Sequence, residues 1–323
     1  MKLRTLLIGS AAICVSSAAF AADMRAPAYK APPPPPVSSV TWEVGGRYWF
    51  STGKNAYDYL AGPNAGDIRI SRLSYEDLHG HTGEAYFRLD SRIGAASSIF
   101  LKGYVGGGGI RNGKLFDEDF PPLFVPYSKT VSDVDGKLFY GSVDLGYNFY
   151  DTMMGYGPGA RLGAFIGYHH WNEKVDARGC TQLAGNPFVC PPGLVPAGVV
   201  GITEEDKWNS LRLGIIGEWA FAPGWKISAE GAYVRASQKA LDIHHFTFGA
   251  APASGKGDGV QAEAILSYQV TQNFTLGGGA RWWYLETNAT DVFNQRLEYK
   301  TERYGGFLQA SYKFGGAPVY ANY

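Results

Sequence analysis

Two short pairs of polar residues have the spacing needed to activate a water molecule. Asp242 and His244 are two positions apart, as are Asp117 and Asp119. On extended chain, residues i and i+2 point to the same face. A carboxylate can fix the tautomer of a histidine and stabilise the imidazolium as the ring takes a proton from water. A facing pair of carboxylates can hold that water. The chain contains neither HExxH nor GxSxG, so no zinc or serine-nucleophile motif competes with this hypothesis.

The elements that must position these pairs are predicted to be strands with one apolar and one wet face. In the segment ending at Phe149, Val143 and Leu145 share the apolar face. Asp144 and Asn148 share the opposite face. A soluble β-sandwich does not need a charged inward face, whereas a transmembrane barrel alternates lipid-facing and lumen-facing residues. The pattern therefore predicts an all-β protein, a ten-stranded antiparallel transmembrane β-barrel.

The connections between the predicted strands run alternately long and short, as between the outside and the periplasm. The predicted strands at 68–92 and 224–243 are far longer than the ~9–11 residues that span a bilayer, so the barrel is predicted to project above the outer membrane. The predicted strands are 41–57, 68–92, 97–110, 136–150, 159–176, 206–221, 224–243, 259–271, 274–290 and 298–314. The predicted extracellular loops are 58–67, 111–135, 177–205, 244–258 and 291–297.

The two ends of the chain are predicted to lie outside the barrel. Residues 1–21 have the charged start, short apolar run and small-x-small cleavage site of a signal peptide. Residues 22–40 include five consecutive prolines, which hold a polyproline II conformation and cannot join a sheet. We interpret them as a Pro-rich periplasmic linker. The barrel is assigned to residues 41–314 and a C-terminal tail to 315–323.

Charge and cysteine usage narrow the partners and the compartment. Without Lys2 and Arg4 the mature chain has 27 basic and 29 acidic residues, which gives no reason to expect nucleic acid. Cys14 offers a lipoprotein alternative, disfavoured because the preceding residue is not small. Cys180 and Cys190 are predicted to form a disulfide in an oxidising compartment. A metal site is disfavoured there, since no His or further Cys stands at ligand spacing.

The order and separation of the two pairs resemble those of the omptins, outer-membrane endopeptidases built on a ten-stranded barrel. The omptin pattern places an Asp-x-Asp pair in the second extracellular loop region and an Asp-x-His pair in the fourth. Here these positions hold Asp117-Glu118-Asp119 and Asp242-Ile243-His244. The resemblance extends over essentially the whole barrel. Other segments that carry it are Arg161-Leu162-Gly163, Gly167-Tyr168, Ala177-Arg178-Gly179, Ser71-x-Leu73 and Gly53-Lys54.

The resemblance implies an aspartic-type endopeptidase, monomeric and without a cofactor, that acts on extracellular peptides or proteins. Asp117 and His244 would hold the attacking water. Asp242 would orient His244, and Asp119 would help to stabilise the tetrahedral intermediate.

The chain departs from the omptin pattern at two places. Tyr57 and Ala240 stand where omptins that cut between basic residues have acidic pocket residues, so that preference does not carry over. Omptins also bind lipopolysaccharide through basic side chains on the outer wall. His170 and Asn172 stand where an acid and an arginine are expected. Lipopolysaccharide, a partner and an activator by resemblance, is therefore expected to act more weakly or through a different site.

Several alternatives stay open at this point. Asp117 and Asp119 would also suit a solvated acidic loop, which is how we interpret Glu204-Glu205-Asp206, and His245 competes with His244. A non-catalytic barrel serving as an adhesin or host-contact protein is the main rival function, and a small porin is the third. Trp42, Trp49 and Trp282 are predicted to be membrane-interface anchors. Arg88, Asp90, Glu263 and Arg281 are predicted to form a charge network in the lumen.

Overall fold

The computed structural model describes residues 40–61, 68–120, 125–153, 158–247 and 249–315. The predicted signal peptide, the linker up to residue 39 and the tail from residue 316 lie outside them. Within these ranges no helix is long and apolar enough to cross a membrane. The strands are β1 Val40–Leu60, β2 Arg69–Glu76, β3 His79–Arg92, β4 Ser98–Asp119, β5 Ser128–Asp151, β6 Gly159–Gln182, β7 Val200–Ala222, β8 Trp225–His244, β9 Gly249–Gln269, β10 Phe274–Asp291 and β11 Arg296–Phe314.

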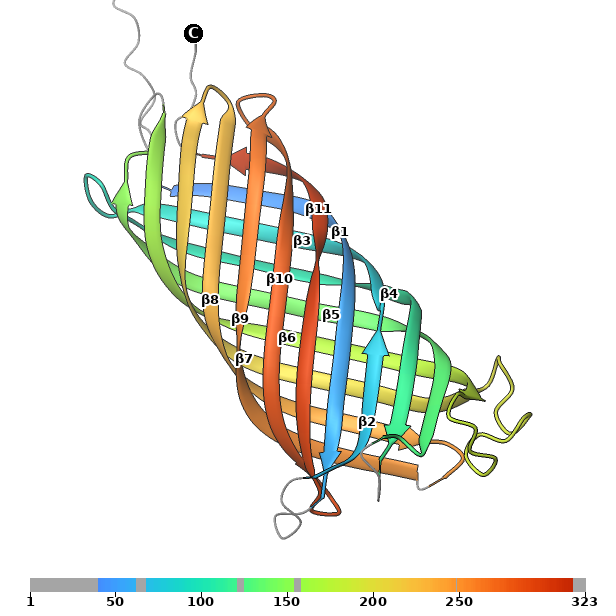
Figure 1. Cartoon of the computed structure of the whole chain (residues 1–323). Helices are drawn as coiled ribbons and strands as arrows, with labels where there is room; N and C mark the ends of the chain where they lie inside the picture. Colours follow the sequence, from blue (N-terminus) through green and yellow to red (C-terminus); the bar gives the residue numbers. More distant parts are fainter. Residues whose placement is uncertain (1–39, 62–67, 121–124, 154–157, 248, 316–323) are drawn as a thin grey trace, which may run out of the picture. The chain divides into compact units, whose positions relative to one another are not determined.

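The strands form one closed antiparallel barrel (Figure 1). Each strand pairs with its neighbours, and β1 pairs with β11 from Trp42 opposite Phe314 onward, which closes the ring. β2 and β3 lie end to end between β1 and β4, separated by Asp77 with a positive φ of 54° and by Leu78. They are two parts of one strand, so the prediction of ten antiparallel strands is confirmed.

The outer face of the barrel has two zones, which β5 illustrates. Toward the end where β1 begins, its outward side chains are apolar, and Phe139, Val143 and Leu145 are all exposed. Such an exposed apolar belt is typical of the lipid-facing band of a transmembrane barrel. Toward the opposite end, the outward side chains become charged, as at Asp133 and Lys137. The barrel therefore extends well beyond its apolar belt. We call this opposite end the far end.

The lumen shows the reverse change in polarity. Inside the belt, β5 and β7 turn Asp144 and Arg212 inward, and these two side chains form an ion pair of 2.8 Å. Beyond the belt, β5 instead turns Val134, Leu138 and Tyr140 inward, all at most 3% exposed. The projecting part thus has an apolar and aromatic interior and a polar outer face that contacts water, like a soluble barrel. The part inside the belt has the opposite arrangement, with a charged interior and an apolar outer face.

This inversion explains why the predicted loops at the far end were too long. β4 continues to Asp119 and β5 begins at Ser128, so the connection predicted at 111–135 is only 120–127. Likewise, the connection predicted at 177–205 is 183–199. The apolar-outward pattern stops at the edge of the belt, but the hydrogen-bonded ladder of the sheet continues past it.

A layer of aromatic side chains closes the lumen between the belt and the far end. The rings of Trp49 and Trp283 are 4.9 Å apart, and those of Trp171 and Trp208 are 4.8 Å apart. All four indoles are at most 2% exposed. The prediction that Trp49 anchors the barrel at the membrane interface is therefore wrong. Trp49 and the outward Trp42 differ in register parity, so they occupy opposite faces of β1.

Candidate functional site

The Asp-x-His pair lies at the far end of β8 and points into the barrel. Even-numbered residues of β8 face inward, and Asp242 is 1% exposed. His244 Nε2 and Asp242 Oδ2 are 3.2 Å apart, within hydrogen-bonding distance. With its Nε2–H donated to Asp242, a neutral imidazole carries its lone pair on Nδ1. The predicted inward direction of both side chains is confirmed.

The Asp-x-Asp pair lies on the last residues of β4, which is a strand here and not the predicted loop. Asp117 and Asp119 are the cross-strand partners of Leu73 and Ser71 on β2. Both carboxyl groups interact electrostatically with His244, although β4 and β8 are not neighbouring strands. The structure therefore places the two predicted pairs near each other at the mouth of the barrel, with Asp117 and Asp119 partly buried on a strand and not in the loop that the solvated-loop alternative assumed.

The carboxyl pair has raised proton affinity. Burial raises the pKa of Asp117 to about 7; the charge of Asp119 adds to this rise and His244 opposes it. Burial also raises the pKa of Asp119, while a hydrogen bond with Ser71 and the charge of His244 act against the rise. At neutral pH this pair is therefore partly protonated, and it can both accept and donate hydrogen bonds.

The histidine responds to the same charges in the opposite sense. Burial disfavours the charged imidazolium of His244, but the hydrogen bond with Asp242 and the charges of Asp242, Asp117 and Asp119 outweigh it and raise its pKa. The adjacent His245 is bonded differently, with its Nε2 3.1 Å from Thr203 Oγ1. The geometry thus selects His244, which alone of the two pairs with Asp242.

Three residues beneath this pair were not predicted from the sequence to belong to the site. Tyr59 on β1 donates a hydrogen bond to Asp242 Oδ2 at 3.3 Å. Glu204 and Asp206 are buried residues on the inward face of β7, each 1% exposed, so their interpretation as a solvated loop is wrong. The available signal was the i, i+2 spacing that Glu204 and Asp206 share with the inward Trp208.

The positions predicted to replace the acidic pocket of omptins are buried. Tyr57 is 1% exposed and donates a hydrogen bond to Glu204 Oε2 at 3.1 Å. Ala240 is 5% exposed and lies directly opposite Asp206. Tyr57 and Ala240 therefore occupy these two positions of the inner wall. Each lies next to a buried acidic residue, Glu204 and Asp206 respectively.

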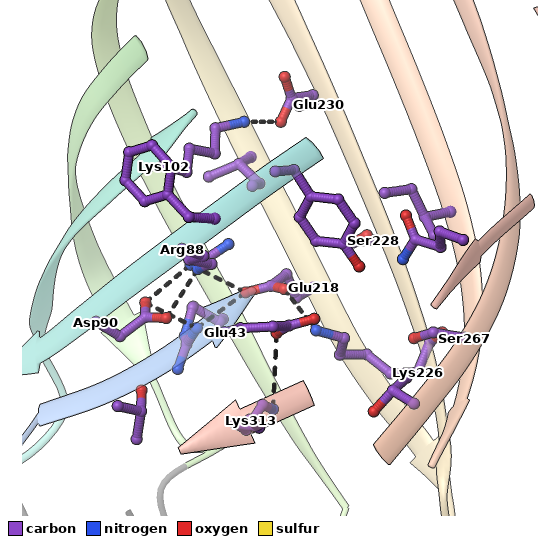
Figure 2. Close-up of a pocket in the computed structure, with 18 of the residues that line it drawn as sticks. Glu43, Arg88, Asp90, Lys102, Glu218, Lys226, Ser228, Glu230, Ser267 and Lys313 are labelled. Carbon is purple, nitrogen blue, oxygen red and sulfur yellow. Dashed lines mark hydrogen bonds and ion pairs between the residues drawn. The ribbon is translucent and has the colours of Figure 1, made fainter. Parts of the chain in front are cut away.

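A second feature is a cavity of about 300 Å³ inside the apolar belt, on the other side of the aromatic layer. Figure 2 shows Arg88 between Asp90 and Glu218, with Lys226 on the far side of Glu218. Lys102 pairs with Glu230 on another wall of the same cavity. These mutually paired charges form the predicted lumen network, together with the ion pair of Arg281 and Glu263. Its cations already have acidic partners, so we assign the network a structural role.

Two further predictions concern ligands and cross-links. Cys180 and Cys190 form a disulfide with their Cα atoms 5.9 Å apart, as predicted. Within the described part of the chain, no group of three or more His, Cys, Asp or Glu side chains is arranged to hold a metal ion. The candidate site at the far end consists of Asp117, Asp119, Asp242 and His244, with Tyr59 hydrogen-bonded to Asp242 and Glu204 directly opposite it on β7.

Comparison with known proteins agrees with the fold. The chain matches no protein-family model and no curated protein. The outer membrane protease OmpT from Escherichia coli is similar in structure with a TM-score of 0.65 and 15% identity, over 85% of this chain and 97% of OmpT. A FadL homologue from Pseudomonas aeruginosa covers 85% of this chain and 90% of its own at 10% identity, but its TM-score of 0.32 carries no argument. The fold is that of an outer-membrane β-barrel.

Proposed function

We propose that the protein is an outer-membrane endopeptidase of omptin type whose active face is extracellular and whose nucleophile is an activated water. The observation that carries the proposal is the convergence of Asp117 and Asp119 with the hydrogen-bonded Asp242–His244 pair at the far end of the barrel. The structural similarity to OmpT supports it. The proposed enzyme is a monomer: one barrel carries all four groups, so catalysis needs no second copy of the chain.

The hydrolysis would proceed by general base catalysis. Asp117 and His244 hold a water, and His244 takes its proton as the oxygen attacks the carbonyl carbon of the scissile peptide bond. Asp242 keeps the imidazole oriented and stabilises the imidazolium that forms. His244 then gives the proton to the leaving amine as the C–N bond breaks. The products are a carboxylic acid and an amine, and no other reactant is needed.

Asp119, together with the proton that it shares with Asp117, stabilises the tetrahedral intermediate. The tetrahedral intermediate carries a negative charge on the former carbonyl oxygen, and a hydrogen bond donated to that oxygen lowers the barrier. A fully ionised pair could not donate such a bond. The pKa of Asp117, raised to about 7, keeps a proton available on the pair for this purpose near neutral pH.

Adhesion to a host or partner surface is the second candidate, favoured by apolar side chains in the far-end loops. Phe188 is 90% exposed, and Phe246 and Phe293 are about half or more exposed in two other loops. Exposed apolar groups at this end suit contact with another protein. Binding that survives the loss of Asp117 would support adhesion without catalysis.

The test is cleavage of a mixed peptide library by the refolded mature barrel, with and without lipopolysaccharide. We expect His244→Ala and Asp117→Ala to lose ~10²–10⁴-fold of the cleavage rate, the usual contribution of a positioned acid–base group. His245→Ala is the matched control, because it removes an adjacent imidazole outside the pair. Full activity in the His244→Ala or Asp117→Ala variant, with the barrel folded, would refute the proposed site.

A further inference from the structure

A row of buried carboxyl groups continues below the Asp242–His244 pair. Glu204 on β7 is the direct cross-strand partner of Asp242 on β8. Asp206 follows Glu204 on the same inward face, and each of the three is 1% exposed. Directly opposed residues of an antiparallel pair have Cβ atoms ~4.5–5.5 Å apart, so like charges there repel. Three such groups cannot all be ionised without a large electrostatic penalty.

The hydrogen bonds that Glu204 and Asp206 accept come from neutral donors. Asp206 accepts from Asn55 Nδ2 and from Gln238 Nε2, both at 2.6 Å. Glu204 accepts from the Tyr57 hydroxyl through Oε2. Arg303, a buried cation deeper in the barrel, donates to Glu173 at 2.8 Å and so offsets that carboxylate.

The two opposed carboxyl groups, those of Glu204 and Asp242, each have one buried oxygen that needs either a hydrogen-bond donor or a proton. Among the described residues, neither Glu204 Oε1 nor Asp242 Oδ1 accepts a hydrogen bond, although both atoms are buried. A buried carboxylate oxygen without a donor is costly, whereas a protonated carboxyl oxygen is itself a donor. Of the two groups, Asp242 has the partners Tyr59 and His244, which stabilise its charged form, so the proton is assigned to Glu204. Glu204 and Asp206 are within hydrogen-bonding reach of each other. Asp206 can therefore accept a hydrogen bond from a protonated Glu204.

We propose that Glu204 is a positioning residue that stays protonated at neutral pH, donating a hydrogen bond to Asp206 and leaving Asp242 as the one charged carboxylate paired with His244. A second charge opposite Asp242 would hold the imidazolium too tightly for it to return its proton. That catalytic consequence rests on the proposed function, but the protonation of Glu204 does not.

The electrostatic surroundings of Glu204 agree with this assignment. Burial raises the pKa of Glu204 well above its ordinary value, and the charges of Asp206 and Asp242 raise it further. The tyrosines around it are neutral below about pH 10. Among the described residues, the titratable groups around Glu204 are Tyr57 and Tyr59 on β1, Tyr75 on β2, Asp117 on β4, Glu173 on β6, Asp206 on β7, Asp242 and His244 on β8, and Tyr299 on β11.

The test is an NMR titration of His244 in the refolded, histidine-labelled barrel. If Glu204 is already neutral, Glu204→Gln removes no charge, and the midpoint of the His244 titration should stay within ~0.3 pH of the parent. If Glu204 is ionised, the same change removes a nearby negative charge and should lower the midpoint by ~1 pH or more, which would overturn the proposal. Asp242→Asn is the positive control, since it must lower the midpoint in either case.

Difference infrared spectroscopy provides a second measurement that does not depend on peptide cleavage. At neutral pH the parent should show carbonyl bands of protonated carboxyl groups, and one of them, the Glu204 band, should be lost in Glu204→Gln but kept in Asp117→Asn. Absence of the band from the parent would overturn the proposal even if the variant failed to fold. If the band and the titration behave as expected but no peptide is cleaved, the endopeptidase proposal fails and the protonated Glu204 stands.

Discussion

Asp117 on β4 and His244 on β8 interact across the mouth of the barrel, and each shifts the proton affinity of the other. The His244 charge lowers the pKa of Asp117, while the Asp117 charge raises the pKa of His244. The two groups come from strands separated by β5, β6 and β7. Only closure of the barrel brings them together, so the catalytic hypothesis and the closed fold depend on each other.

The pH dependence of cleavage follows from this coupling. The base must be neutral to accept a proton, and its pKa is raised, so activity should increase with pH through a midpoint above the ordinary histidine value of about 6.5. Asp119→Asn removes a charge that raises the pKa of both His244 and Asp117. The acidic limb of the kcat/KM profile should therefore move to lower pH, by ~0.5–1.

The matched control for this profile is Asp133→Asn, which makes the same chemical change on the exposed outer wall, where Asp133 pairs with Lys114. It should leave the acidic limb in place. A limb that moves to higher pH in Asp119→Asn would contradict the assignment, because loss of a negative charge cannot stabilise the imidazolium.

The aromatic layer predicts that the barrel does not conduct ions. Trp49, Trp171 and Trp283 are packed across the lumen between the belt cavity and the far end. Planar-bilayer recordings should show no stable single-channel conductance. Trp283→Ala should lower the free energy of unfolding by ~3–5 kcal/mol, the usual cost of removing a buried tryptophan. Trp282→Ala, on the outward face, should cost far less, and steady conductance of the parent would restore the porin hypothesis.

The fold was predictable because the belt of the barrel repeats one simple pattern. Val143, Leu145 and Phe149 alternate with Asp144 and Asn148. Because lipid surrounds the barrel and charged side chains fill its lumen, this alternation is required over the whole height of the bilayer. Strand number and direction follow from counting such segments. The strand ends could not be located in this way, because beyond the belt water replaces lipid and the pattern inverts.

The site was predictable in part for the same reason. Asp242 and His244 were assigned inward by parity with the belt residues of β8, which holds because that strand continues unbroken. Glu204 and Asp206 were not found, since the apolar-outward pattern of the belt is absent from their stretch of the sequence and only their i, i+2 spacing with Trp208 indicates a strand there. Tyr59 could not be found at all, because its contact with Asp242 joins residues 183 positions apart.

The disulfide should protect one loop without holding the barrel together. Cys180 and Cys190 enclose nine residues at the far end, including Phe188, which is 90% exposed. Reduction frees this segment, so chymotrypsin should cut after Phe188 several times faster, as measured by mass spectrometry. The thermal transition of the barrel should stay nearly unchanged, because only Thr181 and Gln182 of the enclosed segment take part in a ladder between strands. Equal cleavage rates before and after reduction would contradict this role.

The buried pair of Arg303 and Glu173 should be a main determinant of stability beyond the belt. Arg303 is 0% exposed and donates to Glu173, to Ser51 Oγ and to the Leu78 carbonyl oxygen. A side chain at Gly53 would clash with its guanidinium, since a Cβ there would lie 2.5 Å from Nη2. Glu173→Gln leaves this cation without its counter-charge and should destabilise the barrel by ~3–5 kcal/mol.

A double-mutant cycle separates the interaction free energy of Arg303 and Glu173 from the cost of leaving one of the two charges buried without its partner. Replacing both partners, with Arg303→Met and Glu173→Leu, removes the charges together and should cost clearly less than the sum of the two single changes. Urea unfolding of the refolded barrel measures all four species under one condition. Additive effects would mean that Arg303 and Glu173 do not depend on each other, and the stability beyond the aromatic layer would then have to come from its apolar interior alone.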